Sequence, residues 1–139
     1  MKRWSKKVAG GDIFKLDKIF WPVNLGNTHW TCLVAYMQEK KIIYYDSFGG
    51  AGSHYLEGTL RYFQDEWKAK GKEGDFNPEE WTLEGTPDHY PQQKNGFDCG
   101  VFTTTCADFI SQGKECTFDQ KDITLYRRTI ALKIIEYGT

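Results

Sequence analysis

The stretch PQQKNGFDCG, residues 91–100, places a cysteine where its thiol could react. Asn-Gly is a strong turn signal, and an apolar run at helical spacing begins at Val101. Cys99 is therefore predicted to lie in the first turn of a helix. Backbone N–H groups there have no partner within the helix, and the positive end of the helix dipole favours a thiolate. The alternative is a buried, inert helical cysteine, which is the commoner role of an isolated cysteine.

A thiol nucleophile needs a base and a group that orients the base. The chain has three histidines, His29, His54 and His89. His29 opens a predicted strand, where an imidazole can face a cleft, whereas His54 is expected at the start of a helix. His89 lies in the predicted loop TPDHYP, ten residues before Cys99, and is the second choice for the base.

The spacing of His29 and Asp46 can be tested by counting along a predicted hairpin. If MQEK is a four-residue loop, Tyr36 opposes Lys41 and Asp46 opposes Thr31. His29 then shares a sheet face with Asp46, as a diagonal pair about 7–8 Å apart at Cα, within reach of an imidazole and a carboxylate. A three-residue loop would put the two on opposite faces. The alternatives are a surface histidine at a strand edge and an aspartate that ends a strand.

Gln93 could supply a second element of acyl chemistry. It lies six residues before Cys99 in a turn that begins with proline. Its side-chain amide could join the backbone N–H of Cys99 in stabilising an oxyanion. The alternative is an ordinary polar loop residue.

The elements that would position these residues follow from the hydrophobic pattern. Three β-rich segments precede an amphipathic segment with apolar residues at spacings of 4, 3 and 4, and two further helical stripes close the chain. We predict an α+β fold with a small antiparallel or mixed sheet flanked by helices. The expected strands are residues 18–25, 29–36 and 41–47, with at most a short strand at 81–85, and the expected helices are 56–67, 100–113 and 123–137.

Composition narrows the class of protein. The 139 residues are 40% hydrophobic, which suits a single domain over 1–139. With 18 basic against 19 acidic residues, a dedicated nucleic-acid surface is not expected, and the apolar runs are too short for a membrane span. The four cysteines form no C-x-x-C pair, so neither a structural zinc site nor another metal or cofactor is expected. We expect free thiols in an intracellular, reducing compartment.

Three segments together, GNTHW, YYDS and PQQKNGFDCG, resemble the SUMO-specific cysteine proteases, also called sentrin-specific or ubiquitin-like-protein proteases. The similarity extends over essentially the whole chain, including the closing segment DITLYRRTIALKIIEYG. It implies a papain-like architecture with Cys99 as nucleophile, His29 as general base and acid, and Asp46 as the residue that orients His29. It further implies that Gln93 serves the oxyanion hole. Trp30, which the residues alone give only as an aromatic on the strand face opposite His29, would cover the Gly-Gly tail of a substrate.

The resemblance also implies an activity and partners. These are cleavage after the C-terminal Gly-Gly of SUMO or a SUMO-like modifier by a monomer that binds SUMO or SUMO-conjugated proteins, in the nucleus or cytoplasm. Catalytic domains of this family are longer, so an N-terminal part with helices and some substrate surface is expected to be missing here. A catalytically impaired SUMO-binding remnant, a protease for NEDD8 or ubiquitin, and an acyltransferase with the same triad remain alternatives.

Overall fold

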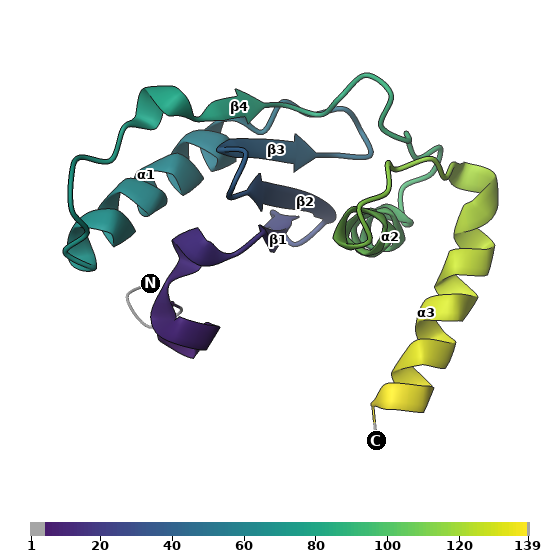
Figure 1. The fold of residues 1–139 in the computed structure, drawn as a ribbon. Helices are drawn as coiled ribbons and strands as arrows, with labels where there is room; N and C mark the ends of the chain where they lie inside the picture. Colours follow the sequence, from purple (N-terminus) through teal and green to yellow (C-terminus); the bar gives the residue numbers. More distant parts are fainter. Residues whose placement is uncertain (1–4, 139) are drawn as a thin grey trace.

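A computed structural model describes residues 5–138, in which helices flank a four-stranded sheet (Figure 1). The sheet order is β1-β2-β3-β4, with the first three strands antiparallel and β4 parallel to β3. This confirms the predicted α+β class with a mixed sheet. The strands are β1 (Lys18–Leu25), β2 (His29–Tyr36), β3 (Lys41–Tyr45) and β4 (Thr82–Glu84); the α-helices are α1 (Ser53–Ala69), α2 (Cys99–Ser111) and α3 (Ile123–Tyr137); and short 3-10 turns are Ser5–Lys7, Ala9–Gly11, Ile13–Lys15, Pro78–Glu80 and Gln120–Asp122.

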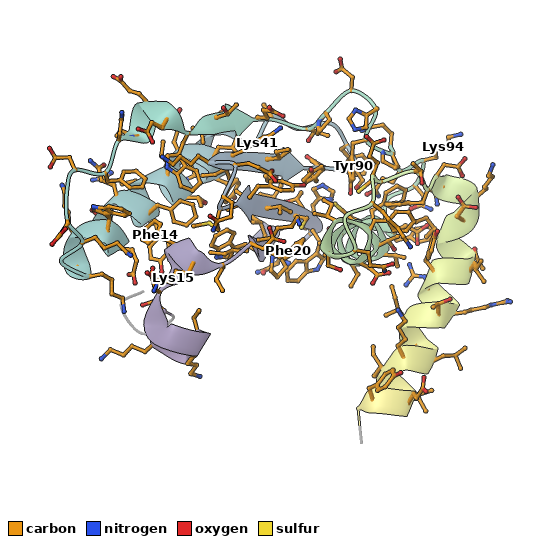
Figure 2. The ribbon with its side chains drawn as sticks, in the orientation of Figure 1. Phe14, Lys15, Phe20, Lys41, Tyr90 and Lys94 are labelled. Carbon is orange, nitrogen blue, oxygen red and sulfur yellow. The ribbon has the colours of Figure 1, made fainter. Side chains whose placement is uncertain are left out.

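The sheet separates two apolar clusters, because successive strand residues point to opposite faces. The side chains of one parity pack with α1, and those of the other parity pack with α2 (Figures 1 and 2). The α1 cluster includes Leu33, Ala35, Ile42, Tyr44, Leu56 and Phe63, and the α2 cluster includes Cys32, Val34, Ile43, Tyr45, Phe102, Cys106 and Ile110. Helices therefore cover both faces of β2 and β3, and five of the eight β2 residues are buried.

The hairpin of β2 and β3 has the register expected from a four-residue loop. Tyr36 pairs with Lys41, and the pairing continues to Cys32 opposite Tyr45. β1 and β2 begin and end where the hydrophobic pattern predicted. β3 ends at Tyr45 instead of residue 47, because Asp46 and Ser47 leave the ladder to form a turn.

Helix α3 departs from the body of the protein, and its C-terminal half projects beyond α2 (Figure 1). Its first residue, Ile123, is buried, whereas several large apolar residues later in the helix are exposed. These exposed residues are Leu125, Leu132, Ile134, Ile135 and Tyr137. Within residues 5–138, no helix has the length and apolar character needed to cross a bilayer.

Two glycines around α1 provide a test of the fold. Gly52, directly before the helix, has φ of +62°, and a Cβ there would collide with the ring of Tyr44, whereas a Cβ on Gly58, inside the helix, would meet open space. We expect Gly52→Ala to lower the free energy of unfolding by about 1–3 kcal/mol. Gly58→Ala should raise it by about 0.5–1 kcal/mol, because alanine loses less conformational entropy in a helix.

Urea denaturation followed by circular dichroism measures both changes. Equal effects of the two substitutions would contradict the left-handed, crowded backbone assigned to Gly52.

Candidate active site

The end of the β2–β3 hairpin joins an imidazole to a carboxylate. His29 is the first residue of β2, and Asp46 directly follows β3. The His29 Nε2 atom lies 2.6 Å from Asp46 Oδ1, with both side chains largely buried. The predicted juxtaposition of these two residues is therefore present, and it leaves the other ring nitrogen, Nδ1, for a further proton acceptor or donor.

The turn after β3 holds the Asp46 carboxylate in place. Its Oδ1 also accepts from the Phe48 N–H at 2.8 Å, and its Oδ2 accepts from the Gly50 N–H at 3.1 Å. Thr86 ties the same turn together, because its hydroxyl accepts from the Asp46 N–H at 3.0 Å and donates to the Gly50 carbonyl at 2.6 Å. A Cβ on Gly50 would collide with Asp46 Oδ2, so glycine is required for this close approach.

Phe48 covers the imidazole from solvent. Its ring centroid lies 4.8 Å from that of His29, at an interplanar angle of 33°. The outer side of Phe48 remains accessible, with 56% of its surface exposed. The imidazole is thus fixed by a carboxylate at one nitrogen and by an aromatic ring beside its plane.

Cys99 lies where the sequence predicted, as the first residue of α2. The thiol is a free cysteine and only 6% of the residue is exposed. Helix α2 packs on β2, and the Trp30 indole Cδ1 lies 3.8 Å from the position that a Cβ would occupy on Gly100. The Trp30 ring therefore lies close to the residue after the cysteine, which places the start of α2 near the start of β2.

Gln93 is buried in the loop before α2 and is held by three hydrogen bonds. Its backbone N–H donates to the Ser47 carbonyl at 2.9 Å, and the Ser47 hydroxyl donates to Gln93 Oε1 at 2.5 Å. Its Nε2 donates to the Asn95 carbonyl at 2.5 Å, which fixes which end of the amide is the donor. One N–H of this amide is left for another acceptor. Ser47 adjoins Asp46, so one dipeptide holds both His29 and Gln93.

Asp98, which precedes Cys99, forms a second buried anchor. Its Oδ1 accepts from Arg127 of α3 at 2.5 Å, and its Oδ2 accepts from Asn95 at 2.7 Å and from Gln120 at 2.9 Å. Burial raises the pKa of the Asp98 carboxyl, but the hydrogen bonds from Asn95, Arg127 and Gln120 outweigh it and hold that pKa below its usual range.

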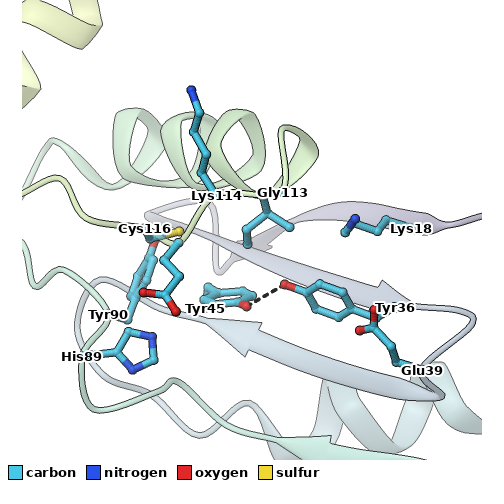
Figure 3. A pocket seen from close by; sticks show the side chains of 11 residues that line it. Lys18, Tyr36, Glu39, Tyr45, His89, Tyr90, Gly113, Lys114 and Cys116 are labelled. Carbon is cyan, nitrogen blue, oxygen red and sulfur yellow. Dashed lines mark hydrogen bonds between the residues drawn. The ribbon is translucent and has the colours of Figure 1, made fainter.

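The other two histidines lie outside this arrangement. His54 is the second residue of α1, as expected. His89, the second choice for the base, borders a cavity of about 300 Å³ with Tyr45, Tyr90 and Cys116 (Figure 3). Neither Cys99 nor Gln93 lines that cavity, so the structure places His89 at a different surface.

The sequence patterns did not indicate three residues that support the site, namely Ser47, Phe48 and Asp98. Each is adjacent in the chain to a predicted site residue or one position beyond it. Their roles depend on side-chain partners 19 to 46 residues away, which spacing along the chain does not reveal. Within residues 5–138, no group of three or more histidine, cysteine or acidic side chains is arranged to hold a metal ion.

The geometry first defines a class of protein, in which a cysteine begins a helix that packs on a β-hairpin and a histidine–aspartate pair lies at the end of that hairpin. Solved cysteine protease structures share the fold. The SUMO protease Ulp1 with its catalytic cysteine oxidised to a sulfonic acid superposes with a TM-score of 0.78 at 34% identity, over 94% of this chain and 57% of that one. The C-terminal Ulp1 protease domain in complex with Smt3, the yeast orthologue of SUMO, gives 0.76 at 34% identity, over 93% and 56%.

The chain belongs to the Ulp1 protease family, whose C-terminal catalytic domain model matches residues 1–139. Human sentrin-specific protease 2 is 38% identical over 136 residues, covering 97% of this chain and 22% of that protein. Ubiquitin-like-specific protease 1A of Arabidopsis thaliana is 37% identical over 137 residues, covering 98% and 27%. The chain thus spans about a quarter of these relatives and little more than half of the solved Ulp1 chains.

The contact of His29 with Asp46 leads to a test that needs no substrate. We expect the His29 ring to reach Cys99, where an imidazolium would favour the thiolate, so His29→Ala should slow alkylation by iodoacetamide at pH 7 by about tenfold. Asp46→Asn should have a smaller effect, because the ring remains but its orientation is lost. His89→Ala is the matched control and should leave the rate unchanged.

Peptide mapping by mass spectrometry identifies alkylation at Cys99. A rate that responds to His89→Ala and not to His29→Ala would reverse the assignment of the base.

Proposed function

We propose that the chain acts as a cysteine-type peptidase and isopeptidase that cleaves after the C-terminal Gly-Gly of SUMO or a SUMO-like modifier. The observation that carries this proposal is the 2.6 Å contact of His29 Nε2 with Asp46 Oδ1 at the edge of the sheet where α2 begins with Cys99. Family membership supports it, and the SUMO substrate is suggested by relatives described as SUMO proteases and by the Ulp1 domain that was solved with Smt3.

In this mechanism, His29 carries the proton between two half-reactions. Nδ1 takes the Cys99 proton, and the thiolate attacks the carbonyl carbon of the terminal glycine. The tetrahedral intermediate collapses as the imidazolium gives its proton to the departing amine, which leaves a thioester on Cys99. His29 then deprotonates a water molecule that attacks the thioester, and the thiol and the free glycine carboxylate are released. Asp46 holds the ring and stabilises its charged form.

Gln93 and Cys99 supply the donors for the oxyanion. The Gln93 amide is buried, pre-oriented by Ser47 and Asn95, and retains a free N–H. The backbone N–H of Cys99, at the start of α2, provides the second donor. Because both are fixed before substrate binds, no reorganisation is needed as the negative charge develops.

Three exposed aromatic residues surround this region and suit a flexible, side-chain-free peptide tail. Trp30, Phe48 and Phe97 expose 42%, 56% and 75% of their surfaces, and they neighbour His29, Asp46 and Cys99 in the chain. Flat rings close to the nucleophile would accept glycine and exclude larger side chains. We expect a monomer to act on SUMO-conjugated proteins or precursors in the nucleus or cytoplasm.

Reaction with a SUMO vinyl sulfone probe tests the proposal directly. The wild-type chain should form a covalent adduct at Cys99, and Cys99→Ser should form none. Cleavage of a SUMO–amide substrate should fall by roughly a thousandfold or more in the same variant. Cys116→Ser, which changes a loop cysteine beside Cys106, is the control and should retain the adduct.

Vinyl sulfone probes built on ubiquitin and NEDD8, compared with the SUMO probe, determine which modifier the chain prefers. Preference for either would overturn the SUMO assignment and keep the protease. Binding of SUMO without an adduct or turnover, unchanged by Cys99→Ser, would show a binding module in place of an enzyme.

The Ser47–Gln93 contact predicts a separate kinetic effect. Ser47→Ala removes the hydroxyl that holds Gln93 Oε1, so the amide N–H should be aligned less often with the oxyanion. We expect kcat to fall about tenfold with KM nearly unchanged, because the interaction forms mainly in the transition state. Ser47→Thr should restore most of the activity.

Ser111→Ala serves as the control, because that hydroxyl donates to Asp108 at the far end of α2. If Ser47→Ala lowers kcat no more than this control does, the role assigned to Ser47 is wrong.

A further inference from the structure

Asp98 occupies the N-cap position of α2 but does not cap the helix. An aspartate at this position usually accepts from the free N–H groups of the first turn. Here the Asp98 side chain makes no such bond, although its backbone carbonyl accepts from Val101 and Phe102. Its carboxylate turns away from the start of α2 and towards α3, so it does not accept a hydrogen bond from the backbone N–H groups beside Cys99.

Three side chains hold the carboxylate in that outward position. Asn95 and Gln120 donate to one oxygen, and Arg127 of α3 donates to the other. The loop is also attached to the 3-10 turn that precedes α3, because the Lys94 backbone N–H donates to Gln120 Oε1 at 2.8 Å. Only 8% of the Asp98 side chain is exposed, so its charge needs a partner.

Without a partner, this charge would oppose the nucleophile. A carboxylate on the residue before Cys99 repels a thiolate, and, released from α3, it could bind the very N–H groups that stabilise the thiolate and the oxyanion. The other titratable groups assigned to the site are His29 and Asp46, which reach it from β2 and from the turn after β3.

We propose that Arg127 is a positioning residue for the nucleophile: it neutralises Asp98 and holds its carboxylate away from the start of α2, so that Cys99 can ionise. The role of the thiolate in cleavage rests on the proposed function, but the effect on ionisation does not. Helix α3, which contributes no group to the chemistry, thereby controls the charge beside the reactive sulfur.

The pH dependence of Cys99 alkylation tests this charge balance without any substrate. Rates of reaction with iodoacetamide are measured between pH 5 and 9 on the full chain, and the midpoint of each profile is compared. Asp98 stays ionised throughout this range because its pKa lies below the usual carboxyl value. Arg127→Gln leaves a net negative charge and should raise the midpoint by about 0.5–1 pH unit, a three- to tenfold loss of thiolate below the midpoint.

For the other variants, the proposal predicts the direction in which the midpoint of the alkylation profile shifts. Asp98→Asn leaves a net positive charge and should lower the midpoint, whereas the double variant restores neutrality and should return close to wild type. Arg127→Lys keeps the charge and should also stay close. Arg128→Gln removes the same charge from the next position of α3, which is likewise exposed, and is the matched control with no shift expected.

Shifts of the same sign for Arg127→Gln and Asp98→Asn, or a shift for Arg127→Gln no larger than for Arg128→Gln, would overturn the proposal. If Arg127→Gln fails to fold by circular dichroism, the double variant must still show a higher midpoint than Asp98→Asn. If the midpoints shift as expected but no modifier is cleaved, the proposed function is refuted and the role of Arg127 stands. If a modifier is cleaved but the midpoints do not shift as expected, the role of Arg127 is refuted and the proposed function stands.

Discussion

The structure depends most on the way a buried carboxylate is satisfied at the end of β3. Asp46 is 6% exposed, and a charge this deep is costly unless its oxygens are hydrogen-bonded. Backbone N–H groups of Phe48 and Gly50 supply two of the partners, and His29 supplies the third. The turn geometry that makes this possible is also the geometry that orients the imidazole, so local stability and the proposed chemistry impose the same requirement on these residues.

That requirement extends outward through hairpin register and through Ser47. Because strand side chains alternate with a period of two, a shift of one residue between β2 and β3 would carry His29 to the face opposite Asp46. The observed pairing, with Tyr36 opposite Lys41, prevents this. Ser47 then transmits the same turn to Gln93, 46 residues away in the chain. The four-residue loop at the far end of the hairpin sets its register, and the register thus determines where the His29 ring and, through Ser47, the Gln93 amide lie.

The sequence was informative wherever a local pattern determines the structure. The β-rich, apolar composition of two segments predicted β1 and β2 to the residue, and the loop length predicted the register that pairs His29 with Asp46. A turn signal before an apolar stripe predicted that Cys99 lies in the first turn of a helix, and Cys99 is the first residue of α2. Contacts made by polar side chains across long separations were not predictable in this way. Arg127 contacts Asp98 across 29 positions, and no periodicity distinguishes it from Arg128.

Strand parity also explains why the proposed site lies at the rim of the sheet. His29 has the parity of Leu33 and Ala35, which pack with α1, whereas Cys99 begins α2 on the opposite layer. Side chains from opposite layers are separated by the sheet along most of its length, so a thiol and an imidazole delivered in this way can meet only beyond a strand end. Trp30, whose side chain has the same parity as the β2 residues that pack with α2, lies close to Gly100 there. The exposed rings of Trp30 and Phe48 lie beside His29 at this strand end, so aromatic surface borders the rim where the proposed site lies.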